Sequence, residues 1–140
     1  LLQRKGLEST FVDSREIFKT DAVVGNAQII NSVSEKLTRD RFATIPPNCV
    51  AVVTGFIAST EKGDTTTLGR NGSNYSAALL ANYLNASELQ NYTHVDGIFT
   101  ANPELVPEAK IIRHLSYEEA NELANFGASI LHAKTIIPLI

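Results

Sequence analysis

The sequence predicts an α/β fold with a mainly parallel sheet, and three observations support this class. Short β-branched runs alternate with helical patterns along the chain, as in strands that are joined by helical crossovers. The run Val50–Thr54 is apolar and rich in β-branched residues, which is typical of a strand covered on both faces. The segment 74–85 is apolar almost all the way round a helix, which predicts a buried helix. No repeat or linker interrupts this pattern, so we expect one compact unit.

The first part of the chain is predicted to hold a strand and a helix. Thr10–Val12 has the composition of a short strand, which ends at Asp13. Asn26–Leu37 is predicted as a helix because Ala27, Ile30, Val33 and Leu37 recur along one face. Pro46 and Pro47 end whatever element precedes them, because proline cannot continue a helix or a ladder.

A hairpin and a glycine-rich loop follow the strand at 50–54. The turn Glu61–Asp64 lies between the apolar segment 56–58 and the threonine-rich segment 65–68, which predicts two antiparallel strands. Gly69–Ser73 is predicted as a loop, and the buried helix is expected over Asn74–Asn85.

The elements predicted for the last part of the chain are shorter and less regular. Leu89–Val95 is predicted as a strand, 98–100 as extended, and 111–112 as a short strand beyond two prolines. Ser116 and Glu119 form a capping box, which predicts a helix running to Asn125. Gly127 is expected to cap the C-terminus of that helix, and a further helix is expected to begin near Ser129.

Composition excludes several classes of protein. A hydrophobic content of 44% with 19% charged residues is incompatible with a disordered chain. The net charge of −3 provides no basic field for nucleic acid, and no apolar run is long enough to cross a membrane, so neither partner is expected. No charged and then apolar segment opens the given sequence, so no export signal is expected, and the single cysteine, Cys49, is expected to be a buried core thiol. These features favour a reducing compartment, the cytoplasm.

The chain holds no methionine, and its first residues look like the end of a helix. We therefore expect residues 1–140 to be a fragment of a domain, truncated at both ends.

The segment Leu68–Tyr75 carries the strongest chemical signal. Its glycines at 69 and 72 let the backbone approach a ligand, and the loop leads into a helix N-terminus, which attracts anions. Arg70 can bind a carboxylate through two parallel hydrogen bonds. These features predict a site for a small carboxylate or phosphate. In the alternative, Gly72 only makes a turn, Ser73 caps the helix and Arg70 is solvated, and the residues alone do not decide between the two.

Several ordered blocks of the sequence resemble aspartokinases, members of the amino acid kinase family. The blocks are Gly55–Ile57, Thr66–Arg70, Gly72–Ala78, Val95–Ile98, Leu115–Leu123, Phe126–Ala128 and Leu131-His132. They have the order and spacing of the family, and Val12–Asp21 looks like the region just before them. Within the family, the chain looks most like the kinase part of aspartokinase–homoserine dehydrogenase fusions.

The resemblance implies a three-layer α/β/α sandwich with a mainly parallel sheet, of which this chain is the C-terminal part of the catalytic domain. It also implies transfer of the γ-phosphoryl group of Mg-ATP to the side-chain carboxylate of L-aspartate, giving 4-phospho-L-aspartate in the first step of lysine, threonine and methionine biosynthesis. A homo-oligomer is expected for the full-length protein.

Site residues follow from the same resemblance. Arg70, Gly72 and Ser73 are expected to bind aspartate, and Asn74 stands at a catalytic position of the family. The nucleotide pocket is expected to include Thr93, His94, Gly97, Phe99, Glu104 and Ser129. No metal-ligating cluster is recognised, because the histidines are too far apart in sequence for a typical metal site.

Five of these positions depart from the pattern of the family. The family has aspartate at positions 74 and 94, tyrosine at 99, arginine at 104 and lysine at 129, whereas this chain has Asn74, His94, Phe99, Glu104 and Ser129. The N-terminal block with the catalytic lysine, K-F-G-G, is not in this chain. Two interpretations stay open: a divergent but active aspartate kinase, or a weakened or inactive kinase-like module with a scaffold, amino-acid-binding or regulatory role beside a fused dehydrogenase. A relative acting on glutamate or a nucleotide fits the motifs less well.

Overall fold

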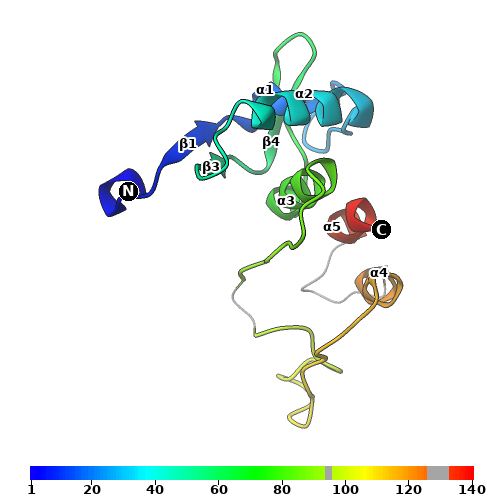
Figure 1. Cartoon of the computed structure of the whole chain (residues 1–140). Coiled ribbons are helices and arrows are strands. Elements are labelled where there is room, and N and C mark those ends of the chain that lie inside the picture. Colours follow the sequence, from blue (N-terminus) through cyan, green and yellow to red (C-terminus); the bar gives the residue numbers. More distant parts are fainter. Residues whose placement is uncertain (94–95, 126–132) are drawn as a thin grey trace.

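The computed structural model describes residues 1–93, 96–125 and 133–140 (Figure 1). A short 3-10 turn, Gln3–Lys5, opens the chain and is followed by strand β1 (Ser9–Val12), helix α1 (Ser14–Ile17) and strand β2 (Lys19–Thr20). Helix α2 (Asn31–Ala43) leads to the strands β3 (Val50–Val53), β4 (Ile57–Thr60) and β5 (Thr65–Thr67). Three helices complete the described chain, namely α3 (Gly72–Tyr83), α4 (Tyr117–Asn125) and α5 (Ala133–Ile136), with a final 3-10 turn over Ile137–Leu139.

The strands form two small sheets with parallel pairs. β1 pairs with β3 in parallel, with Phe11 opposite Val52. β2 pairs with β4 in parallel, and β4 pairs with β5 in the antiparallel hairpin that the turn at 61–64 predicts. The α/β class and the parallel pairing are thereby confirmed.

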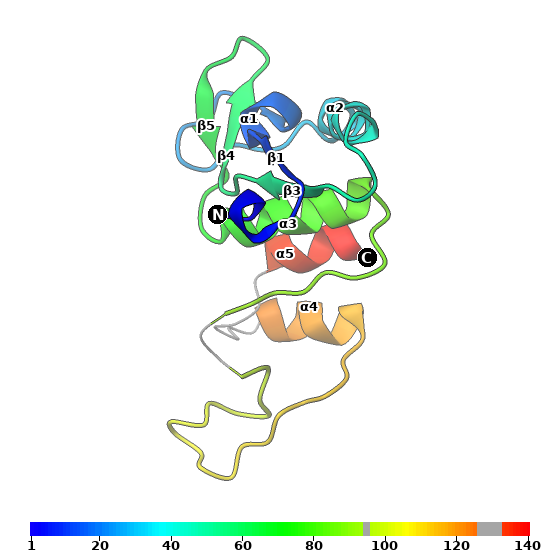
Figure 2. The ribbon, with the colours of Figure 1, turned by 60° about the vertical axis from the view of Figure 1, so that its left-hand side comes forward.

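One apolar cluster joins these layers. It combines residues of β1, α1, β4 and α3 with Phe18 and Leu68, and its buried members are Val12, Ile17, Phe18, Ala58, Leu68, Leu79 and Tyr83. The ring of Phe18 meets that of Tyr83 edge to face, with centroids 6.5 Å apart. The Tyr83 hydroxyl donates to Oδ1 of Asn31, 2.6 Å away, and burial raises the pKa of this hydroxyl. Figure 2 shows α3 between the strands above it and α5 and α4 below it.

The predicted helix at 26–37 begins five residues too early. Residues 26–30 are not helical, because Ala27 N donates to Thr67 O at 3.0 Å and Ile30 N donates to Lys19 O at 2.8 Å. Bonds to neighbouring strands thus hold this segment extended, and α2 starts only at Asn31. The helix also runs six residues beyond its predicted end at Leu37, and it ends at Ala43, three residues before Pro46.

Two strand predictions need correction. The strand at 50–54 is present as β3, but it is not covered on both faces, since Val50 and Val52 stay 43% and 45% exposed. Their side chains lie on the open face of the β1–β3 pair. Leu89–Thr93 forms no strand, and it is not part of either described sheet.

The helix start that the sequence predicts near the end of the chain is present in the structure. The capping box is confirmed on both sides: Glu119 N donates to Ser116 Oγ at 3.1 Å, and Ser116 N donates to a carboxylate oxygen of Glu119 at 2.8 Å. Gly127 and the expected helix start at Ser129 lie outside the described residues.

The expectation that Cys49 is a buried core thiol is wrong, since Cys49 is half-buried at the start of β3 and is not part of the core. No helix among the described residues is long and apolar enough to span a bilayer.

Candidate active site

A tight turn places Arg70 directly before helix α3. Gly72 N donates to Gly69 O at 3.0 Å, so Arg70 and Asn71 form the two central positions of the turn. Asn71 has a left-handed backbone with φ of 58°, which asparagine tolerates better than most residues. The helix begins at Gly72, two residues earlier than expected, and Ser73 is not its cap. The turn itself therefore starts the helix, without a side-chain cap.

Gly72 is buried because an aromatic ring covers it. A Cβ placed on Gly72 would lie 2.9 Å from Cδ2 of Phe56 and 3.1 Å from Cβ of Leu68. Contacts at these distances leave no room for a side chain. Glycine at position 72 thus has a packing reason, and Phe56 lies directly against the N-terminus of α3.

Phe56 itself has an uncommon backbone conformation, with φ of 74°. Its N–H donates to Ser76 Oγ at 3.1 Å, and its carbonyl accepts a bond from Leu68 N at 2.9 Å. Ser76 Oγ in turn donates to Gly72 O at 2.9 Å. Phe56 was not expected as a site residue, and a positive φ in an aromatic residue has no sequence signal beyond the preceding Gly55.

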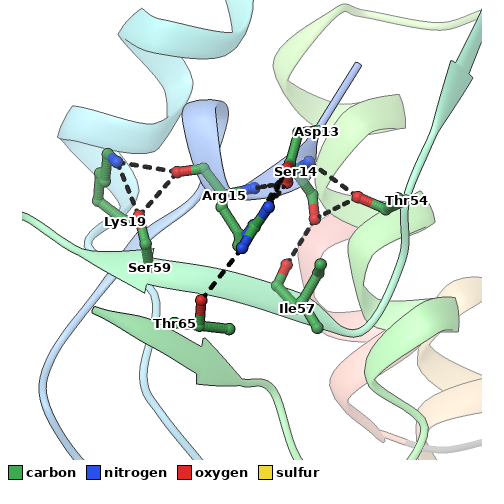
Figure 3. A network of polar contacts seen from close by, with 8 residues as sticks. All are labelled: Asp13, Ser14, Arg15, Lys19, Thr54, Ile57, Ser59 and Thr65. Atoms are coloured by element: carbon green, nitrogen blue, oxygen red, sulfur yellow. Dashed lines mark hydrogen bonds and ion pairs between the residues drawn. The ribbon is translucent and has the colours of Figure 1, made fainter. Parts of the chain in front are cut away.

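Ser14 forms hydrogen bonds to Thr54 and Ile57, the two ends of the connection that contains Phe56 (Figure 3). Its N–H donates to Thr54 Oγ1 at 2.9 Å, and its hydroxyl donates to Ile57 O at 2.6 Å. Because the Ser14 hydroxyl proton is used in this way, the contact of 2.9 Å between the two hydroxyls must have Thr54 as its donor. Ser14 is fully buried, so this network fixes residues 54–57 to the start of α1.

Arg70 is the cation at this site. Its side chain is exposed, and within the described ranges no carboxylate lies at ion-pair distance from it. It stands beside the positive end of α3, where Ser73 is exposed and Asn74 half-buried. Burial raises the pKa of the nearby Tyr75 hydroxyl, which therefore stays neutral. An unpaired guanidinium beside a helix N-terminus can hold a small anion.

Arg15, by contrast, is already paired. Its guanidinium contacts both carboxylate oxygens of Asp13 and donates to Thr65 Oγ1 at 3.3 Å (Figure 3). The hydrogen bonds from Arg15 hold the pKa of Asp13 below its ordinary value, and the same pair raises the pKa of Arg15. This pair joins α1 to strand β5 and leaves Arg70 as the cation that faces solvent at the turn.

Three of the expected nucleotide residues, Gly97, Phe99 and Glu104, lie in a separate part of the described chain. Segments 98–100 and 110–112 form a short antiparallel ribbon, in which Phe99 is opposite Ile111. Gly97 precedes this ribbon, and Glu104 lies exposed in its connecting loop, where its N–H donates to Asn102 Oδ1 at 3.0 Å. In both ribbon views this segment lies beyond α4, at the end of the molecule opposite the β4–β5 hairpin (Figures 1 and 2).

The structure thus brings together the expected aspartate-binding residues, while the expected nucleotide residues that it describes lie in two other segments. Arg70, Gly72, Ser73 and Asn74 share one turn and the first turn of α3. Thr93 is exposed on the irregular segment that follows α3, while His94 and Ser129 lie outside the described residues. No group of three or more possible metal ligands occurs among the residues that the structure describes.

Comparison with known proteins gives consistent matches. The model of the amino acid kinase family matches residues 1–140. The chain is 38% identical over 141 residues to bifunctional aspartokinase/homoserine dehydrogenase 2 of Arabidopsis thaliana, covering all of this chain and 15% of that protein. It is 36% identical over 140 residues to lysine-sensitive aspartokinase 3 of Escherichia coli, covering all of this chain and 31% of that protein.

A solved structure supports the fold directly. The crystal structure of E. coli aspartokinase III in complex with aspartate and ADP superposes with a TM-score of 0.91 at 37% identity. The match covers 98% of this chain and 31% of that chain. The chain therefore spans less than a third of the length of each of these relatives.

Proposed function

The chain belongs to the amino acid kinase family, and we propose that it is part of an aspartate kinase, in which the turn at Arg70 binds the amino acid substrate. Residues 1–140 would form the C-terminal part of the catalytic domain in a longer polypeptide. The identity of 36–38% with aspartokinases, over the whole of this chain, supports this assignment.

The observation that carries the proposal is the isolated charge of Arg70. Its side chain is exposed on a turn that is packed on both sides, and no described carboxylate pairs with it, whereas Arg15 is paired with Asp13. A carboxylate placed at the turn would receive two hydrogen bonds from Arg70 and would lie near the N–H groups of the first turn of α3. L-Aspartate has an α-carboxylate for this contact and a side-chain carboxylate that remains available to react.

The reaction needs no general base in this part of the protein. The side-chain carboxylate of aspartate is already ionised at neutral pH, so one of its oxygens can attack the γ-phosphorus of ATP. A carboxylate–phosphorus bond forms, the bond to the β-phosphate oxygen breaks, and ADP leaves. The work of the protein is to position two anions and to neutralise their charge. Arg70 and the N-terminus of α3 supply that function on the aspartate side.

The nucleotide is proposed to bind through Thr93, His94, Gly97, Phe99, Glu104 and Ser129, as the resemblance implies. E. coli aspartokinase III, the structural match, was solved with ADP bound, which supports nucleotide use in this chain. The described residues contain no cluster for a resident metal ion, so Mg²⁺ would be held mainly by the phosphates of the nucleotide. It would supply charge neutralisation on the phosphates.

A kinase-like module with weakened activity is the second candidate. The observation that favours it is Glu104, whose exposed carboxylate stands where the family has an arginine and would repel a phosphate. In this case the turn at Arg70 would still bind an amino acid, but phosphoryl transfer would be slow.

The test follows ADP release by the full-length protein as aspartate and Mg-ATP are varied. We expect ADP release that depends on aspartate, and an Arg70→Ala variant whose KM for aspartate rises by about tenfold or more, as for the loss of a charge-assisted bidentate contact. Aspartate that binds without turnover would favour the weakened module. Failure of aspartate to bind would refute the proposal.

A further inference from the structure

The loop between β2 and α2 contacts the turn of Arg70, and its neck is closed by its own hydrogen bonds. Asp21 N donates to Gln28 O at 3.1 Å, and the Asp21 carboxylate accepts from Gln28 N at 3.0 Å and from Val23 N at 3.2 Å. An antiparallel bridge between Thr20 and Ile29 continues this pairing. We call residues 21–28 the neck-closed loop.

This loop is also attached to the hairpin that leads to Arg70. Ala27 is buried, and its N–H donates to Thr67 O at 3.0 Å. Thr66 precedes Thr67 in β5, and its hydroxyl shares a buried hydrogen bond of 2.7 Å with the hydroxyl of Thr20. The neck-closed loop and the end of β5 therefore form one bonded unit, and its position is fixed a few residues before Arg70.

Asn26 is the residue of this loop that reaches the turn. Gly69 has φ of 76°, and a Cβ on Gly69 would lie 2.6 Å from Oδ1 of Asn26 and 3.3 Å from the carbonyl oxygen of Gly25. The Asn26 side chain thus lies directly against the backbone at the first position of the turn. The turn is held from two sides, by Asn26 at Gly69 and by Phe56 at Gly72.

We infer that Asn26 is a positioning residue, which fixes the backbone of Gly69 and so aims the Arg70 guanidinium at the substrate carboxylate. The inference rests on the proposed function, since it concerns the same aspartate-binding turn. Asn26 does not touch the substrate in this arrangement; it acts through Arg70. The tip of the loop, Val23-Val24, plays no part in it, because Val24 is 96% exposed and points into solvent.

The position of Asn26 predicts which kinetic constant changes when Asn26 is substituted. A carboxylate held by Arg70 is bound equally in the ground state and in the transition state, because its bonds do not change during phosphoryl transfer. Loss of uniform binding raises KM and leaves kcat unchanged. Asn26→Ala should therefore raise the KM for aspartate by about three- to tenfold, which is no more than the loss expected for Arg70→Ala because Asn26 acts only through Arg70, with kcat and the KM for ATP within about twofold of the unsubstituted protein.

The experiment is a double-mutant cycle on kcat/KM for aspartate in the full-length protein, with Asn26→Ala, Arg70→Ala and the double variant. If Asn26 acts through Arg70, then Asn26→Ala causes no further loss once Arg70 is alanine. Val24→Ala, at the exposed tip of the same loop, is the matched control and should behave like the unsubstituted protein. Thermal unfolding of each variant shows whether the fold is intact.

The outcomes separate the two proposals. If Arg70→Ala impairs aspartate use while Asn26→Ala does not, or if the losses of the two variants simply add, the positioning role of Asn26 is wrong and the proposed function stands. If the unsubstituted protein neither binds nor phosphorylates aspartate, the proposed function fails, and the role of Asn26 fails with it.

Discussion

The ring of Phe56 covers the α-carbon of Gly72, so that a Cβ at position 72 would come within 2.9 Å of the ring atom Cδ2. This contact joins the connection between β3 and β4 to the first residue of α3. Phe56 holds a positive φ, and hydrogen bonds to Ser76 and Leu68 fix its backbone. The N-terminus of the helix and the turn of Arg70 therefore depend on a close packing contact that tolerates little added volume.

Gly72→Ala is expected to destabilise the protein. Alanine is favoured over glycine in a helix by about 1 kcal/mol, but overpacking against Phe56 and Leu68 costs about 1–3 kcal/mol, so the net free energy of unfolding should fall. Urea denaturation measures this change. Asn82→Ala, at an exposed position of the same helix, is the control and should not lower the stability. A Gly72→Ala protein as stable as the original would show that the Phe56 ring moves aside freely.

Ser14→Ala tests the network that holds the connection around Phe56. The substitution removes the partner of the Ile57 carbonyl and the acceptor of the Thr54 hydroxyl, and both of these hydrogen bonds are partly buried. Leaving such groups unsatisfied costs about 1–3 kcal/mol each, so the free energy of unfolding should fall by at least this amount for one group. Ser32→Ala, at an exposed position of α2, provides the matched control in the same denaturation experiment. Equal midpoints for the two variants would contradict the proposed network.

Elements defined by neighbours in the sequence could be predicted, while those defined by distant partners could not. The capping box at Ser116 and Glu119 needs only four consecutive residues, and both of its hydrogen bonds are present. The segment before α2 has a helical pattern, but Ala27 bonds to Thr67, far along the chain, and this bond keeps it extended. Inside α2 the buried positions include Ser34, whose hydroxyl bonds to both backbone groups of Lys19. An apolar pattern cannot reveal such a polar inner face.

In the candidate site, too, some residues could be predicted from the sequence and others are revealed only by the structure. Arg70 and Gly72 are recognisable because they lie in one continuous motif, which the structure folds into one turn and helix start. Phe56 and Asn26 approach that turn from separate loops, and only the folded chain shows their contacts with Gly72 and Gly69. Their roles depend on packing between distant segments, which leaves no fixed spacing in the sequence.

The Asp13–Arg15 pair predicts a loss of stability in acid. Arg15 lowers the pKa of Asp13 in the folded state, so the pair stabilises the protein at any pH above the ordinary pKa of an aspartate, about 4. This contribution disappears as the pH falls through the lower folded-state pKa, because the carboxyl is then protonated in both states. An asparagine in place of Asp13 would still cap α1, since asparagine caps a helix as well as aspartate does.

The measurement compares Asp13→Asn with the unsubstituted protein in denaturant at a series of pH values. The variant should be the less stable protein at pH 7, and the difference should shrink steadily below about pH 4. Glu61→Gln, in the exposed hairpin turn, removes the same formal charge and should not show this convergence. A difference that is constant from pH 7 to pH 2 would mean that the ion pair is not its cause.

Asn74→Asp tests whether the departures from the family pattern weaken catalysis. The resemblance implies that a carboxylate at this position holds the catalytic lysine of the N-terminal block, and an amide forms a weaker bond to a cation than a carboxylate does. Asn74 is half-buried in the first turn of α3, where an aspartate is also favoured by the helix dipole, by about 0.3–1 kcal/mol. The variant should therefore fold at least as well as the original.

The kcat of Asn74→Asp for aspartate-dependent ADP release should rise by up to about tenfold, which corresponds to about 1.4 kcal/mol of added stabilisation of the transition state. Asn82→Asp, near the end of the same helix, adds an equal charge away from the turn and should leave kcat unchanged. If Asn74→Asp raises the melting temperature but not kcat, the carboxylate at this position has only a structural effect, and its role in holding the lysine is wrong.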